Sequence, residues 1–248
     1  MFANDIKQLL DENVQRYNTP AFIKDDPVQF PRRYSVKQDI EIVSFIVAHI
    51  SWGKRVMILR NAEKMLALMG SSPYEYVING RYRRLGTANI HRTFFQNDLK
   101  YFLAGFERIL QKHASLEDFL AVNNAANAWD TARLFLDEML KANGGLSNRY
   151  CLPVNPENSA LKRINMALRW LVRNDGIVDM GIWHILKQSE LYIPLDVHAA
   201  RTARSLGLLK RRSNDRKAVE ELTCALRQFC PEDPVKYDFA LFGVGVNL

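Results

Sequence analysis

The chain has 248 residues, 48% of them apolar, and its 34 Lys and Arg against 27 Asp and Glu give a formal charge of +7. This apolar content excludes a disordered chain, and the length suffices for one large domain or two small ones with a real core. The positive surplus favours a polyanionic partner, although a merely basic soluble protein explains the charge equally well.

The cysteines and histidines carry no metal-ligand spacing. Cys151, Cys224 and Cys230 are scattered, so we expect free thiols in a reducing cytoplasm, and three thiols alone do not hold an iron–sulfur cluster. We therefore expect neither a metal nor a cofactor. A secretory signal and a membrane-spanning apolar run are both lacking, which favours a cytoplasmic protein without a membrane partner.

Apolar residues recur with helical spacing along most of the chain. In the first part, this spacing predicts helices over residues 5–17, 36–52, 55–69, 74–78, 98–113, 116–122 and 129–140. A polar link with prolines covers 19–33, and a basic, irregular segment covers 81–92. Both interruptions are short compared with the helices around them.

The second part continues the pattern after a Pro- and Asn-rich loop. Helices are predicted over 161–173, 183–188, 215–229 and 233–242, with a further helix entered at Pro194-Leu195-Asp196. No strand series, repeat or flexible linker stands out. We therefore predict one compact, multi-helix, all-α domain over 1–248, with two lobes and a cleft between them. The middle lobe covers about 36–145, and the other joins 1–35 to 146–248.

The predicted helix over 161–173 carries its cations on one face. At about 100° per residue, Lys162, Arg169 and Arg173 fall almost in line. Lys162 also lies in the first turn, where the other two cations and the helix N-terminus disfavour an extra proton, so we expect a neutral amine that acts as a nucleophile. The two plainer interpretations are a solvated basic face and phosphate contact without chemistry.

Asp196 stands where a proline and an apolar residue deliver the chain to a helix. Aspartate is a favoured N-cap, so the plain interpretation is a capped helix. The sharper one is a carboxylate fixed at a rigid junction and open to a cleft. His198 follows within the first turn and is expected to point toward the same cleft.

Other residues offer contacts for a nucleic acid. Arg201 belongs to a series of basic clusters, among them Arg81-Tyr82-Arg83-Arg84, and each cluster alone is more often solvated surface. Trp52 and Trp183 have the rings to stack a base, although tryptophans at helical spacing more often belong to the core. Phosphate-binding glycine loops and serine-nucleophile elbows are absent from the sequence.

The run Leu195-Asp196-Val197-His198, followed by Arg201 and Leu206-Gly207-Leu208, resembles the aspartate segment of the helix-hairpin-helix DNA glycosylase superfamily. Lys162 resembles the Schiff-base lysine of its bifunctional members, and its distance in sequence from Asp196 is similar to that in the archaeal 8-oxoguanine glycosylase branch. The resemblance implies a DNA glycosylase-like fold, a flipped base, attack by Lys162 and charge stabilisation or proton uptake by Asp196. It also implies phosphate contacts or carboxylate orientation by Arg169, Arg173 and Arg201, and a backbone contact by His198.

A second resemblance covers most of the chain. The runs Lys162 to Trp170, Pro194-Leu195-Asp196 and Asp233 to Ala240 are similar to those of DUF2400, a family of uncharacterised bacterial proteins. In the place of the glycosylases' Leu-Pro-Gly-Val-Gly hairpin, this chain has Leu152-Pro153-Val154-Asn155-Pro156.

Three functions follow from these observations. The first is a base-excision repair glycosylase, with or without lyase activity, whose partner is duplex DNA with a damaged base such as an oxidised purine. The second, favoured by the missing hairpin glycines, is an inactive nucleic-acid-binding module on the same scaffold. The third is a helical enzyme that holds a small anionic substrate with its arginines. No sequence feature specifies an oligomeric state.

Overall fold

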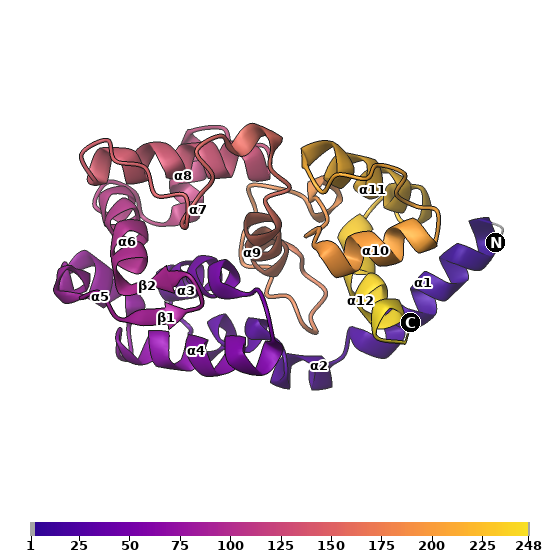
Figure 1. The fold of residues 1–248 in the computed structure, drawn as a ribbon, viewed down its shortest axis with the longest axis horizontal. Coiled ribbons are helices and arrows are strands. Elements are labelled where there is room, and N and C mark those ends of the chain that lie inside the picture. The colour runs from indigo at the N-terminus through magenta and orange to yellow at the C-terminus, as the bar shows by residue number, and fades with distance from the viewer. Residues whose placement is uncertain (1–2, 248) are drawn as a thin grey trace. The chain divides into compact units, whose positions relative to one another are not determined.

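The computed structural model describes residues 3–247, and the side chains of 3–245. Helices make up 63% of the chain and strands 3%, which confirms the predicted all-helical class. The chain divides into two compact units (Figure 1). One unit is Asp25–Pro156, and the other joins the segment up to Lys24 to the segment from Glu157 onward. Each unit is described by itself below.

The Asp25–Pro156 unit is built around one almost fully buried helix. Its elements are η1 (Pro27–Gln29), η2 (Pro31–Arg33), α3 (Lys37–Ile50), α4 (Arg55–Ala67), α5 (Pro73–Ile78), η3 (Arg81–Arg84), β1 (Asn89–His91), β2 (Phe94–Phe95), α6 (Gln96–Leu110), α7 (Leu116–Val122) and α8 (Ala128–Ala142). On α3, Phe45 meets the rings of Phe106 and Phe135 edge to face, with centroids 6.0 and 5.0 Å away. This aromatic cluster joins α3, α6 and α8 in one core.

A short hairpin stands in the segment expected to be irregular. β1 pairs antiparallel with β2, and Arg92 between them has a φ of 52°, in the left-handed region. Both ring nitrogens of the buried His91 find partners, Asn61 Nδ2 at 2.9 Å and the Trp52 carbonyl oxygen at 2.8 Å. Sequence periodicity does not reveal this hairpin because each strand is at most three residues long.

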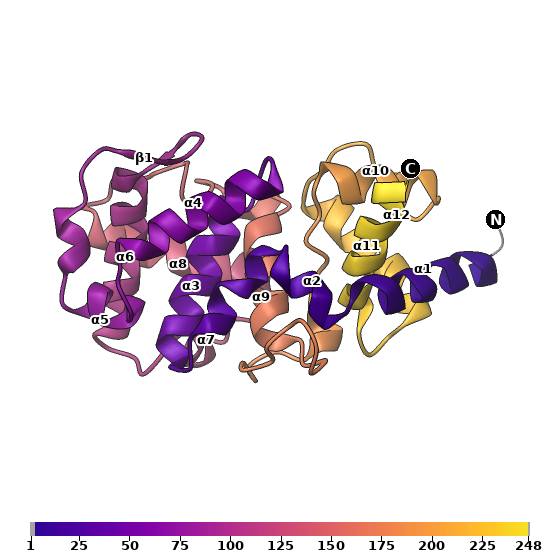
Figure 2. The ribbon, with the colours of Figure 1, turned by 90° about the horizontal axis from the view of Figure 1, so that it is seen from below.

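The second unit brings the two ends of the chain together. Its elements are α1 (Ala3–Tyr17), α2 (Pro20–Lys24), α9 (Lys162–Val172), η5 (Gln188–Glu190), α10 (Val197–Ser205), α11 (Arg216–Phe229), η6 (Pro234–Lys236) and α12 (Tyr237–Asn247), with η4 (Pro156–Asn158) at the boundary. Both α1 and α10 pack on α12, as Figures 1 and 2 show. The rings of Tyr17 and Phe242 meet edge to face, with centroids 5.6 Å apart. Two ends of the sequence thus share a core.

Two local predictions are wrong. The helix predicted over 183–188 is absent, and only the 3-10 turn η5 follows it. There the backbone N–H of Trp183 donates to the Leu171 carbonyl at 2.8 Å, so the chain runs back along α9. The link over 19–33 contains the helix α2 and two 3-10 turns. Among the described residues, no helix has both the length and the apolar character needed to cross a membrane.

Gly105 provides a test of the packing between α6 and α8. A Cβ built there would lie 2.5 Å from Met139 Cγ and 3.1 Å from Met139 Cα, so the backbone would have to move. We expect Gly105→Ala to lower the free energy of unfolding by about 1–3 kcal/mol, although alanine gains about 1 kcal/mol in helix propensity. Gly86→Ala is the control, because its Cβ would meet Gln96 Oε1 at 3.6 Å. Equal denaturant midpoints for the two variants would contradict this close packing.

Candidate functional site

Lys162 is the first residue of α9, and an unusual backbone turn places it there. Leu161, just before it, has φ 45° and ψ 40°, a left-handed conformation that costs a residue with a side chain about 1–3 kcal/mol. Its buried side chain and the hydrogen bond from Asn165 Nδ2 to the Ala160 carbonyl, at 3.1 Å, hold the turn in place. The N-cap residue Leu161 makes no side-chain capping hydrogen bond to α9. The lysine therefore starts the helix from a fixed backbone.

Asp196 is the N-cap of α10 and also a partner of Lys162. Its Oδ1 accepts hydrogen bonds from the backbone N–H groups of His198 and Ala199, both at 2.9 Å. Its Oδ2 lies 3.4 Å from Lys162 Nζ. The buried Leu195 anchors the chain just before the cap. One oxygen therefore caps the helix while the other faces the amine, so the two interpretations of Asp196 are compatible.

The amine and the carboxylate both remain accessible. The side chain of Lys162 is 26% exposed and that of Asp196 is 37% exposed. They belong to segments 34 residues apart in sequence, since 196 minus 162 is 34. Two helix starts thus meet at a pair that a solute can reach. Chemically, the pair offers a nitrogen nucleophile with a carboxylate within reach of its proton.

Arg169 and Arg173 lie on the same face of α9 as Lys162, but they are buried. Arg169 pairs with Asp179, at 3.3 Å, and with Asp238. Arg173 pairs with Asp179 at 3.0 Å, with Asp233 at 2.8 Å and with Asp175. We call these six residues the arginine–aspartate network. Its two arginine side chains are only 3–4% exposed. The structure thus gives Arg169 and Arg173 a structural role in place of the phosphate contacts expected from the sequence.

The network shifts the pKa values of its members in opposite directions. Burial disfavours the charged form of Arg173, but Asp179, Asp233 and Asp175 outweigh it and raise the pKa of Arg173. Burial also raises the pKa of Asp179, although both arginines oppose this shift. At Asp175, burial raises the pKa, but the Arg173 charge and the hydrogen bonds from Ile177, Asn18 and Arg173 together outweigh burial and lower it. The carboxylate of Asp179, which is fully buried, is therefore the one whose ionised form burial disfavours most.

Asp238 joins the network electrostatically to the Lys162–Asp196 pair. Burial is the largest cause that raises its pKa, to about 6, and the negative charges of Asp196 and Asp179 raise it further. The Arg169 and Lys162 charges lower it. The Asp238 carboxyl is thus a proton-binding group that responds to the charge of both Lys162 and Asp196.

The remaining predicted site residues have different environments. His198 and Arg201 are exposed on α10, beside the cap, and neither side chain has a hydrogen bond or ion pair to another described residue. Trp183 is 1% exposed and belongs to the core, which excludes base stacking by its ring. Trp52 belongs to the other unit, where the Arg92 guanidinium lies 4.6 Å from its ring centroid.

Sequence reasoning misses the four aspartates of the network. The run Asp233 to Ala240 stands out only as a family mark without a role, and the segment with Asp175 and Asp179 only as an interruption between helices. The available signal is the need of a buried arginine for a carboxylate partner. Among the described residues, no group of three or more His, Cys, Asp or Glu side chains is placed to hold a metal ion.

The fold and this site define an all-helical protein with an accessible lysine–aspartate pair above a buried ionic network. A family model matches residues 26–247, and the chain belongs to the DUF2400 family, described as a protein of unknown function. Comparisons with curated proteins and with solved structures gave no match.

Asp238→Asn tests the electrostatic link. The folded protein binds the Asp238 proton more tightly than the unfolded chain does, so this contribution to stability is full below the ordinary aspartate pKa of 3.8 and is lost as pH rises through about 6. Two pKa units correspond to about 3 kcal/mol. The stability of wild type relative to Asp238→Asn should therefore fall by up to about that amount over this range.

The measurement is denaturant unfolding of both proteins between about pH 4 and pH 7. Glu232→Gln, which removes an exposed carboxylate from the same unit, controls for the loss of one negative charge. A difference between wild type and Asp238→Asn that is independent of pH would contradict the raised pKa.

Proposed function

We propose that this protein is a DNA glycosylase with lyase activity that removes a damaged base through a Schiff base on Lys162. The observation that carries the proposal is the distance of 3.4 Å between Lys162 Nζ and Asp196 Oδ2, at the starts of two helices. A nucleophile and a base within such reach, each on a fixed element, is the arrangement that covalent catalysis needs. The resemblance of the segments around Lys162 and Asp196 to DNA glycosylases supports the same function, including a preference for an oxidised purine.

The first chemical step joins the lysine to the sugar. With the target nucleotide flipped out of the duplex, Lys162 gives a proton to Asp196 and its neutral amine attacks C1′. The bond from C1′ to the base nitrogen breaks, and the base leaves with the bonding electrons and takes up a proton. In the alternative route, the leaving base takes the lysine's proton, and Asp196, still ionised, stabilises the positive charge that develops on the sugar.

The second step cleaves the strand. Opening of the sugar ring gives a Schiff base between Lys162 Nζ and C1′. Loss of a proton from C2′ then expels the 3′ phosphate, and water hydrolyses the Schiff base and releases the lysine. In this proposal His198 and Arg201, which are exposed on α10, contact the DNA backbone. Arg169 and Arg173 act indirectly, because their carboxylate partners fix α9.

A second candidate function is DNA binding without chemistry. The segment Leu152-Pro153-Val154-Asn155-Pro156 has no glycine. The helix-hairpin-helix DNA glycosylases usually hold a DNA phosphate with the backbone N–H groups of glycines in a hairpin. A different binding mode, or a different target, is consistent with this departure. The two candidates differ in one measurable property, a covalent adduct with DNA.

Borohydride trapping on oligonucleotides with 8-oxoguanine, uracil or an abasic site tests the proposal. Wild type should form a stable adduct, and Lys162→Gln should form none because the amine is gone. Lys187→Gln, which removes another exposed lysine of the same unit, should trap as wild type does. An adduct with Lys162→Gln, or none with wild type where a control enzyme traps, would exclude the lysine mechanism.

Asp196→Asn separates the charge of Asp196 from its capping role. Asparagine is as good an N-cap as aspartate, so α10 and the stability of the protein should be preserved. The rate of adduct formation should fall roughly 10²–10⁴-fold, because the proton acceptor and the negative charge are lost. Single-turnover kinetics measure the rate, and thermal unfolding checks the cap. A rate close to that of wild type would show that Asp196 only caps the helix.

A further inference from the structure

The three arginines of the 3-10 turn η3 lie on two different sides of the turn. With about three residues per turn, Arg81 and Arg84 lie one above the other, while Arg83 points elsewhere. Arg83 pairs with Glu107, which also accepts a hydrogen bond from the Tyr82 hydroxyl at 2.7 Å. Glu107 thus has Arg83 and Tyr82 as partners, and it pairs with neither Arg81 nor Arg84.

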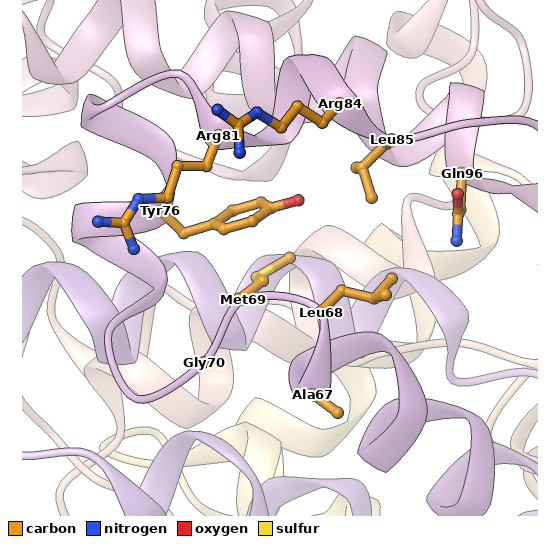
Figure 3. A pocket seen from close by; sticks show the side chains of 9 residues that line it. All are labelled: Ala67, Leu68, Met69, Gly70, Tyr76, Arg81, Arg84, Leu85 and Gln96. Atoms are coloured by element: carbon orange, nitrogen blue, oxygen red, sulfur yellow. The ribbon is translucent and has the colours of Figure 1, made fainter.

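Arg81 and Arg84 border a hollow with an apolar floor. The hollow has a volume of about 470 Å³ and lies between the end of α4, helix α5 and η3. Its apolar lining is formed by Leu68, Met69, Tyr76 and Leu85. In the view of Figure 3, the Tyr76 ring lies below the Arg84 side chain and above Met69 and Leu68, and its hydroxyl points toward Leu85. The volume falls in the range of pockets that hold small organic molecules.

Arg81 and Arg84, like Arg60 of the same unit, have no counter-charge among residues 3–245, whereas other arginines there are paired. Arg33 pairs with Glu63 and Arg108 with Glu138, both at 2.7 Å. Neither Arg81 nor Arg84 has a carboxylate partner or another side-chain hydrogen bond among residues 3–245. Two like charges one helical turn apart repel each other. An anion between them removes that repulsion and gives both guanidinium groups a partner.

The far side of the hollow carries a fixed hydrogen-bond donor. Gln96 Oε1 accepts from the backbone N–H of Gly86 at 2.8 Å, which sets the orientation of the amide. The Gln96 NH₂ group is then a donor at the opposite side of the hollow from the arginines (Figure 3). The hollow therefore has a cationic side, an apolar middle and a donor at its other side.

We propose that this hollow binds an organic phosphate, with the phosphate between Arg81 and Arg84 and a flat apolar group on Leu68 and Tyr76. Guanidinium pairs suit phosphate because two N–H groups reach two oxygens at once. The shared chemistry is that of a nucleoside phosphate, free or at the end of a DNA strand. The proposal is independent of the chemistry at Lys162, which belongs to the other unit.

Calorimetric titration with deoxyadenosine 5′-monophosphate tests the site. Wild type should bind this nucleotide at least tenfold more tightly than deoxyadenosine or inorganic phosphate. Arg81→Gln and Arg84→Gln should each weaken binding by about tenfold, since each removes a charged partner worth about 1.4 kcal/mol or more. Arg60→Gln is the matched control, because Arg60 is an exposed arginine of α4 outside the hollow.

Two further experiments distinguish a free nucleotide from a DNA strand end, and the apolar contacts of the hollow from its phosphate contacts. A short single strand with a 5′ phosphate should bind like the mononucleotide if the strand end is recognised, and no better than the unphosphorylated strand if only free nucleotides fit. Leu68→Ser should weaken nucleotide binding but leave that of inorganic phosphate unchanged. Lys162→Gln should leave all these affinities unchanged. No nucleotide binding, or equal binding by the Arg81→Gln/Arg84→Gln double variant, would overturn the proposal.

Discussion

The arginine–aspartate network is the constraint on which the second unit depends. Asp179 has a side-chain exposure of 0%, and it holds both Arg169 and Arg173. Loss of one partner from a buried pair leaves an uncompensated charge, which typically costs about 3–5 kcal/mol. Because Asp233 and Asp238 come from the segment that enters α12, these pairs fix α9 against α12. Because an unpaired buried charge costs so much free energy, each buried arginine must stay within hydrogen-bond distance of its aspartate partners.

The same contacts also fix the backbone beneath the partly exposed Lys162–Asp196 pair. Lys162 lies on the same face of α9 as the buried arginines, so the network that fixes α9 also fixes the base of the lysine side chain. Asp196 is held by two backbone N–H groups and by α10, which packs on α12. Helix α12 thus positions both partners: it holds α9 through the ion pairs of the network, and α10 packs on it. From this fixed backbone the Lys162 side chain, 26% exposed, reaches to within 3.4 Å of Asp196.

Local signals in the sequence predict where helices begin, but they do not predict which residues far apart in the sequence come into contact. The starts of α9 and α10 could be predicted because an N-cap aspartate and helical periodicity are local signals. The environment of Arg169 could not, because Asp238 lies 69 residues away and only the fold brings it close. The wrong helix over 183–188 has a similar cause: there tertiary hydrogen bonds such as that of Trp183 to Leu171 override a helical apolar pattern. Local periodicity predicts which face is buried, but it does not predict what neutralises a charge on that face.

The distribution of charge also changes what the composition implies. The formal charge of +7 averages over the chain, but the face of α9 has the opposite balance. There Lys162, Arg169 and Arg173 meet Asp175, Asp179, Asp196, Asp233 and Asp238, so carboxylates outnumber cations. The positive surplus must therefore lie elsewhere, as at Arg81 and Arg84 or at Arg201. A net charge indicates a polyanionic partner only through such exposed cations, because a buried, paired arginine adds to the count but not to the field that an approaching phosphate meets.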